Sequence, residues 1–160
     1  MGISMATHEG YIRHALMLAQ KARQLGEVPV GALVVKDNHI IGEGWNQPIL
    51  QHDPSAHAEM MAIRAAAFHL KNYRIPNTTL YVTLEPCPMC AGLMIHARIQ
   101  RLVFAAYDPK TGAAGGQFSF LNDHAHNHQI EVIGGVLETE CSTDLKAFFK
   151  ERRAFNKRKR

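Results

Sequence analysis

The sequence lacks the features that mark secreted and membrane-spanning proteins. Only three cysteines occur among its 160 residues, and an odd, sparse set cannot supply the disulfide framework of a small secreted domain. No apolar run is long enough to cross a membrane, and no apolar stretch follows a basic start as in a signal peptide. We therefore expect a cytoplasmic protein with no membrane partner.

Internal repeats, low-complexity stretches and linker-like segments are also missing. Hydrophobic residues make up 46% of the chain and charged residues 20%, which is a composition that can bury a core and argues against disorder. The length suits one domain of ordinary size. We expect a single domain over residues 1–160.

The net charge of +4 is spread unevenly. Residues 150–160 hold seven basic side chains and one acidic side chain, a balance of +6, so residues 1–149 together carry −2. This basic C-terminal tail, from about residue 150, suits a polyanion such as a nucleic acid. A solvated, frayed chain end would have the same composition, so the tail alone does not decide between these interpretations.

Apolar residues at helical spacing predict a first helix over residues 8–25, capped by Thr7 and ended by Gly26. Two β-rich runs, 28–35 and 39–45, flank the turn signal Asp37-Asn38 and predict a hairpin. A loop over 46–53 should lead into a second helix that has Asp53 as its N-cap and Pro54 at its first position and that ends near Leu70. The remaining elements are expected as strands at 79–84, 102–106 and 129–133, helices at 87–97 and from about 137, and a long loop at 107–128.

Strands that alternate with helices indicate an α/β protein layered around one sheet, and the opening hairpin makes that sheet mixed. Two short segments stand out at the starts of predicted helices. They are His57-Ala58-Glu59 and Pro86-Cys87-Pro88-Met89-Cys90. Alone, the first can be a surface pair on a helix, and the second can be a redox dithiol, half a zinc site or a buried inert pair.

Together the two segments predict a catalytic zinc site. Residues i and i+3 of a helix share a face, so Cys87 and Cys90 can present both sulfurs to one ion, at a helix start that favours thiolates. His57 adds a third ligand from another helix. Two thiolates and a neutral imidazole balance the charge of Zn²⁺, and three protein ligands leave the fourth tetrahedral position to water.

Glu59 is predicted to move protons rather than to bind the metal. Residues two apart on a helix do not share a face, so Glu59 is poorly placed as a second ligand beside His57. A carboxylate at the edge of the cavity can take a proton from the attacking water, pass it to a ring nitrogen and later protonate a leaving amine.

The combination of His-x-Glu with Pro-Cys-x-x-Cys is the signature of the zinc deaminases, and the chain resembles the cytidine deaminase superfamily. Over almost its entire length it is similar to the bacterial tRNA-specific adenosine deaminases. The stretches that carry this resemblance, besides the two segments above, are Glu27–Ala32, Gly42–Asn46, His52–Pro54, Leu80–Glu85, Met94–His96, Lys110–Gly115, Asn127–His128, Phe148–Phe149 and Arg152–Arg153.

The resemblance implies a three-layer α/β/α fold with a mixed five-stranded sheet, one zinc ion per subunit and a homodimer. It implies hydrolysis of adenosine to inosine at the wobble position of a tRNA anticodon, with the anticodon stem-loop as partner. Two family positions would hold the base: the Asn46 side chain and the backbone near Ala58. Four others would contact the anticodon loop, namely Asp108, Lys110, Phe149 and Arg152.

Several of these residues also have ordinary structural interpretations. Asn46 follows a strand and can be a turn residue, although its closeness to the predicted site favours a functional role. Asp108-Pro109 is a common turn initiator. Phe149 has helical spacing with Leu145 and Phe148, so it can belong to the core.

Two other functions compete with tRNA deamination. The first is a guanine or cytosine deaminase of the same superfamily, which has less need of the 108–115 loop and of a basic end. The second is a non-catalytic, zinc-stabilised RNA-binding module, which would not require Glu59 or an open zinc position. A redox dithiol protein would leave His57 and Glu59 unexplained.

Overall fold

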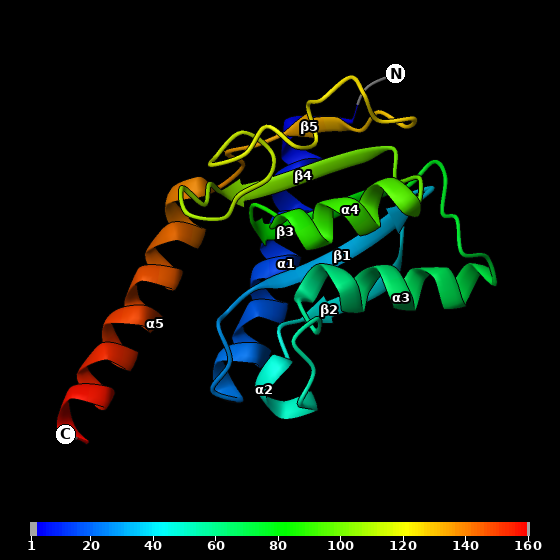
Figure 1. Cartoon of the computed structure of the whole chain (residues 1–160). Helices are drawn as coiled ribbons and strands as arrows, with labels where there is room; N and C mark the ends of the chain where they lie inside the picture. The colour runs from blue at the N-terminus through cyan, green and yellow to red at the C-terminus, as the bar shows by residue number, and fades with distance from the viewer. Residues whose placement is uncertain (1–2, 160) are drawn as a thin grey trace.

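The computed structural model describes residues 3–159 as a five-stranded sheet between two layers of helices (Figure 1). This confirms the predicted α/β/α fold; Arg160, the last residue of the predicted basic tail, lies outside the described residues. The elements in chain order are α1 Met5–Gln24, β1 Gly31–Lys36, β2 His39–Trp45, α2 Pro48–Gln51, α3 Ala58–Leu70, β3 Thr79–Leu84, α4 Pro88–His96, β4 Arg101–Ala106, β5 Glu131–Ile133 and α5 Glu138–Arg158.

The sheet has the strand order β2-β1-β3-β4-β5 and is mixed, as predicted. Strand β1 is antiparallel to both β2 and β3, whereas β3, β4 and β5 run parallel. Trp45 at the end of β2 lies opposite Gly31, and Leu84 at the end of β3 lies opposite Ala106 at the end of β4. The segments that follow β2, β3 and β4 therefore leave the sheet at the same edge, where α/β sheets commonly bind ligands.

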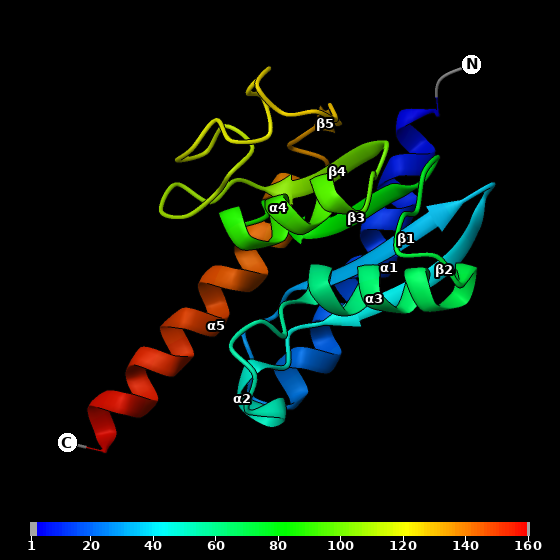
Figure 2. The same ribbon diagram turned by 45° about the vertical axis from the view of Figure 1, so that its right-hand side comes forward.

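Helices α3 and α4 cover one face of the sheet, and α1 lies on the other (Figure 2). Polar side-chain contacts join the C-terminal end of α1 to helix α5. The guanidinium of Arg23 contacts Asp144 at 3.4 Å and Glu151 at 2.7 Å, and the Gln20 amide donates to Asp144. The C-terminal half of α5 extends beyond the sheet, so its basic side chains lie on an exposed helix (Figure 1).

Glycines in the hairpin allow the helices to approach the sheet closely. A β-carbon at Gly31 would lie 2.0 Å from the Ala15 carbonyl oxygen of α1, and one at Gly44 would lie 2.3 Å from the Ala58 carbonyl oxygen of α3. Both distances are far below van der Waals contact. The missing side chains at these positions therefore set the spacing between the layers, including the depth at which α3 sits.

Two predicted helix starts are wrong because the capping groups come from other residues. Helix α1 begins earlier than expected, since Ser4 rather than Thr7 is its N-cap and accepts from the Thr7 N–H at 3.2 Å. Helix α3 begins at Ala58, after Asp53 and Pro54. The Asp53 carboxylate instead accepts from both the backbone N–H and the hydroxyl of Ser55, which closes a turn ahead of the helix.

The other expected elements are present, with boundaries that differ by a few residues. The hairpin turn is confirmed, with Asp37 and Asn38 at φ values of 50° and 63°. The expected loop after β2 contains the short helix α2, whose first N–H groups donate to the buried Glu27 carboxylate. Among residues 3–159, no helix has both the length and the apolar character needed to span a membrane.

The close packing of α3 on β2 predicts a large effect for Gly44→Ala. We expect the substitution to lower the free energy of unfolding by about 1–3 kcal/mol, because the added methyl group must displace helix backbone. Gly10→Ala is the matched control: nothing lies within 4 Å of its added methyl group, and alanine is the better helix former. Denaturant unfolding of both variants measures the difference, and equal stabilities would contradict the packing argument.

Candidate active site

Three candidate metal ligands converge where helices α3 and α4 begin. His57 is the N-cap of α3, Cys87 is the N-cap of α4, and Cys90 lies in the first turn of α4. The His57 Nδ1 atom is 3.6 Å from the Cys87 sulfur and 3.5 Å from the Cys90 sulfur. This is the one group of at least three potential ligands found among residues 3–159.

The spacing of the three ligand atoms fits tetrahedral zinc. Bonds of about 2.3 Å to sulfur and about 2.05 Å to nitrogen at a tetrahedral angle place the two ligand atoms about 3.6 Å apart. Both sulfur–nitrogen distances agree with that value. Because only three protein groups converge, a tetrahedral ion here retains one position for water, which is typical of a catalytic site.

Electrostatics at the helix starts favour metal binding by the cysteines. A hydrogen bond from Cys90 lowers the pKa of the Cys87 thiol to about 4, and the same contact, with burial, raises the pKa of Cys90. Cys87 is therefore the readier thiolate, and a bound cation would replace the proton of Cys90. The hydrogen bond with Cys87 raises the pKa of His57. A metal would instead bind the neutral ring.

Glu59 lies in the first turn of α3 and is only 4% exposed. It is not part of the ligand group, as its spacing from His57 predicts. Burial raises the pKa of its carboxyl group to about 7, so the group can be protonated or ionised close to neutral pH. A general acid–base catalyst needs this property.

Asn46 and Ala58 are joined to each other. The side-chain oxygen of Asn46 accepts a hydrogen bond of 2.8 Å from the Ala58 N–H and thereby satisfies a free donor at the start of α3. The contact uses the oxygen of the amide and leaves its nitrogen to donate elsewhere. Asn46 therefore combines a structural role at the helix start with a donor group near Glu59 and His57.

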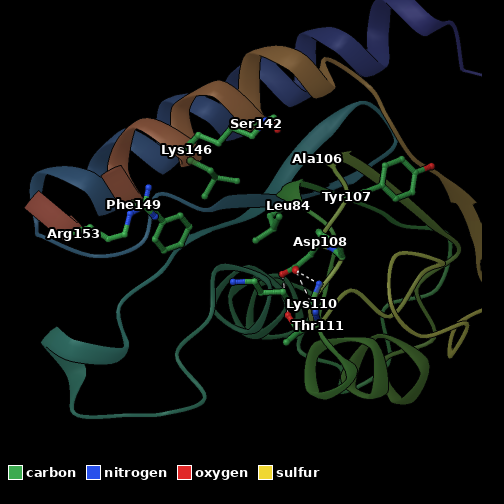
Figure 3. Close-up of a pocket in the computed structure, with 12 residues that line it drawn as sticks. Leu84, Ala106, Tyr107, Asp108, Lys110, Thr111, Ser142, Lys146, Phe149 and Arg153 are labelled. Atoms are coloured by element: carbon green, nitrogen blue, oxygen red, sulfur yellow. Dashed lines mark hydrogen bonds between the residues drawn. The ribbon is translucent and has the colours of Figure 1, made fainter. Parts of the chain in front are cut away.

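A pocket of about 610 Å³ opens between the loop after β4 and helix α5 (Figure 3). One of its walls carries Asp108 and Lys110, and Phe149 lies on the opposite wall. The Asp108 carboxylate accepts hydrogen bonds from the Lys110 and Thr111 N–H groups and so shapes the loop itself. No metal ligand lines the pocket, but Leu84, at the end of β3, does.

Helix α5 presents only some of its predicted contact residues to this pocket. Phe149 lines the pocket and is 42% exposed, whereas Phe148 is buried. The Arg152 guanidinium donates to the Gly26 carbonyl oxygen and lies over the Phe148 ring, outside the pocket. Arg153 lines the pocket instead.

Sequence reasoning missed two basic residues of the pocket, Lys146 and Arg153. A signal for them exists, because residues three and four apart share a helix face. Counting from Phe149, that rule selects Lys146, Arg152 and Arg153, and the structure turns only Lys146 and Arg153 toward the pocket. The missing information was which face of α5 is turned toward the loop.

Fold, ligand set and buried glutamate together define a zinc-dependent deaminase. Residues 5–106 match the family described as the cytidine and deoxycytidylate deaminase zinc-binding region. That stretch runs from the start of α1 to the end of β4 and contains the metal ligands and Glu59.

Within this family, the chain is similar in sequence to enzymes described as tRNA-specific adenosine deaminases. A tRNA-specific adenosine deaminase from Haemophilus influenzae is 58% identical over 91% of this chain and 84% of its own length. A structure from a study of A-to-I editing by tRNA:A34 deaminases is 38% identical, with a TM-score of 0.81, and covers 84% of this chain and 98% of its own. The chain belongs to the tRNA-specific adenosine deaminase family.

Similarity extends beyond this family. A guanine deaminase structure from Bacillus subtilis is 37% identical with a TM-score of 0.62, and the alignment covers 78% of this chain and 82% of that one. The metal centre is therefore embedded in a fold that also serves deamination of a free base.

The ligand geometry predicts the effect of removing one sulfur. Cys90→Ala should abolish stoichiometric zinc binding, because only two of the three protein ligands would remain. Cys141→Ala is the control, since this buried cysteine lies in α5 and should leave the zinc content unchanged. Metal analysis after dialysis measures zinc per chain. Full zinc retention by Cys90→Ala would refute the assigned ligand set.

Proposed function

We propose that this chain hydrolyses adenosine to inosine at the wobble position of a tRNA anticodon. The observation that carries the proposal is the pairing of a zinc-type deaminase centre with a neighbouring pocket that has basic and aromatic residues on one wall. Two of the relatives described above support it, namely the tRNA-specific adenosine deaminase from Haemophilus influenzae and the structure from the study of tRNA:A34 deaminases. The wobble base lies in a single-stranded loop and can enter a site without disrupting a duplex.

His57, Cys87 and Cys90 hold the zinc, which supplies Lewis-acid activation of the attacking water when bound. Glu59 is the proposed catalytic residue. Its buried carboxylate accepts one proton from the water and delivers it to a ring nitrogen of the adenine. It then takes the second proton from the new hydroxyl group on C6 and gives it to the departing amino group, so that ammonia leaves and the C6 carbonyl forms. The balance is water and adenosine consumed, inosine and ammonia released. A pKa of about 7 for Glu59 lets the same group act as base and then acid.

Asn46 and the start of α3 are proposed to orient the base. The hydrogen bond from the Ala58 N–H fixes the Asn46 side chain, so its amide nitrogen points to one place as a donor. A fixed donor distinguishes bases by their acceptor atoms at little entropic cost. Ala58 contributes through its backbone N–H, which donates to Asn46 and holds that side chain at the start of α3.

The pocket between the loop and α5 is proposed to bind the anticodon loop around the reacting base. Lys110, Lys146 and Arg153 bring positive charge to its lining, and Phe149 exposes an aromatic ring. Positive side chains neutralise phosphates, and aromatic rings stack on unpaired bases. Asp108 orders the loop through its own hydrogen bonds. Arg152 would first have to leave Gly26 and Phe148 to reach RNA.

Helix α5 extends the basic surface beyond the pocket, since it continues to Arg158. We propose that this end follows the stem of the RNA as part of one catalytic domain over residues 1–160. The homodimer and the cytoplasmic location implied by the resemblance to tRNA deaminases also remain proposals. Sedimentation equilibrium would measure the mass of the dimer directly.

Guanine deamination is the second candidate function, because of the likeness to the Bacillus subtilis guanine deaminase. Free guanine has no phosphate and needs only a small site. The basic residues Lys110, Lys146 and Arg153 around the pocket favour RNA. Assays with free guanine, cytosine and adenosine in parallel with RNA distinguish the two substrate classes.

Glu59→Gln tests the chemistry. The substitution preserves shape but removes the proton acceptor, so we expect inosine formation in an anticodon stem-loop to fall by at least about 10²-fold, with zinc content unchanged. Glu9→Gln, at a half-buried glutamate in α1, is the control and should retain activity. Mass spectrometry of the RNA provides the measurement. Undiminished activity in zinc-loaded Glu59→Gln would refute the assigned role, and a protein that binds RNA without any turnover would be a non-catalytic module.

Phe149→Ala tests the RNA pocket. Stacking on an aromatic ring contributes about 1–3 kcal/mol per base, so we expect KM for the stem-loop to rise about tenfold or more while kcat changes little. Phe68→Ala is the matched control, because that ring is exposed on α3 away from the pocket. Initial rates across a range of RNA concentrations separate the two constants. An unchanged KM in Phe149→Ala would place the RNA elsewhere.

A further inference from the structure

Glu85 is a buried carboxylate that takes no part in the chemistry described above. It follows β3 directly, precedes Pro86 and Cys87, and is only 2% exposed. Its two oxygens accept three backbone hydrogen bonds from the loop after β4: from Asp108 at 2.9 Å, Ala114 at 2.8 Å and Gly116 at 2.8 Å. A single side chain thus satisfies three donors spread over nine residues of loop.

Two glycines allow the loop to close over this carboxylate. A β-carbon at Gly112 would lie 2.3 Å from the Glu85 carboxylate, and one at Gly116 would lie 2.2 Å from it. Neither distance is tolerated by a real side chain. Glu85, Gly112 and Gly116 therefore form one packed unit, which we name the carboxylate brace.

The carboxylate brace connects the substrate pocket to the metal centre. The loop that it holds carries Asp108 and Lys110, which line the pocket. The backbone around Glu85 is fastened to the end of β4 and to the same loop, since the Glu85 N–H donates to the Ala106 carbonyl and the Pro86 carbonyl accepts from the Ala113 N–H, both at 2.8 Å. The metal ligand Cys87 follows at once in the chain. The segment Glu85–Cys87 therefore both holds the loop that forms one wall of the pocket and carries a zinc ligand.

We propose that Glu85 is a positioning residue that fixes the 108–116 loop relative to the metal centre and so sets the affinity for the RNA substrate. This inference rests on the proposed function for its substrate. Without the carboxylate, three backbone donors lose their common acceptor, and the loop samples other conformations. When only a fraction of molecules has the competent loop, apparent affinity falls by that fraction.

The conservative variant Glu85→Gln isolates the acceptor chemistry. A carboxylate offers only acceptors, whereas one end of a glutamine amide is a donor that would face a backbone N–H. Loss of a hydrogen bond to a charged group predicts an increase of about tenfold in KM for the stem-loop. Bound RNA restores the loop, so we expect kcat to change less than about twofold. Zinc content should stay at the wild-type level.

Gly112→Ala disturbs the carboxylate brace from its other side and provides an independent variant. The added methyl group collides with the carboxylate, so the same increase in KM is expected while Glu85 itself is intact. Tyr81→Phe is the matched stability control. It removes the buried hydrogen bond between Tyr81 and His8 at 2.8 Å, which lies between β3 and α1, and should lower the melting temperature without raising KM.

The experiment uses the zinc-loaded full chain and has two readouts. Amide hydrogen exchange of Asp108, Ala114 and Gly116, measured without RNA, should speed up in Glu85→Gln and Gly112→Ala but not in Tyr81→Phe. Steady-state deamination of the stem-loop gives KM and kcat. Faster exchange with a raised KM supports the proposal. Unchanged exchange in Glu85→Gln, or a loss confined to kcat or zinc content, overturns it.

The two readouts also separate this proposal from the proposed function. If the wild-type chain does not deaminate RNA, the tRNA assignment fails, whereas the exchange rates still report on the carboxylate brace. If wild-type turnover is present and both brace variants keep the wild-type KM, the tRNA assignment stands and the positioning role of Glu85 is wrong.

Discussion

The parallel pairing of β3 with β4 is the constraint on which the functional site depends. Leu84 lies opposite Ala106, so both strands end together and the segments after them meet at one edge of the sheet. One segment carries the cysteine ligands and the other carries the pocket loop. A register change of two residues would move the loop by about 6–7 Å along the strand and separate its N–H groups from the Glu85 carboxylate.

Features that depend on neighbouring residues could be predicted from the sequence. The hairpin follows from Asp37-Asn38, whose backbone accepts the left-handed conformation that a tight turn needs. Cys87 and Cys90 share a helical face because of their spacing alone, and the proline between them suits a helix start. The position of His57 beside them required the family motif as well, because thirty residues separate it from Cys87.

Features that depend on distant partners could not be predicted. The start of α3 is set by Asn46, whose side chain caps the helix from another segment, and a local N-cap pattern at Asp53 misled the prediction. Arg152 faces Gly26 rather than the pocket because of how α5 packs on α1. Helix α2 is held by the buried Glu27, which its own sequence does not reveal.

The fit between Glu85 and its two glycines has an evolutionary consequence. A side chain at Gly112 needs space that becomes available only if position 85 shrinks, and one at Gly116 also collides with the Asp108 carbonyl oxygen. A smaller residue at position 85 leaves three backbone donors without their acceptor. A single substitution at position 85, 112 or 116 therefore disrupts the packing or the hydrogen bonds of the carboxylate brace. Substitutions at these three positions should therefore occur together in related sequences. Other residues of the loop, which do not touch the carboxylate, can be substituted independently.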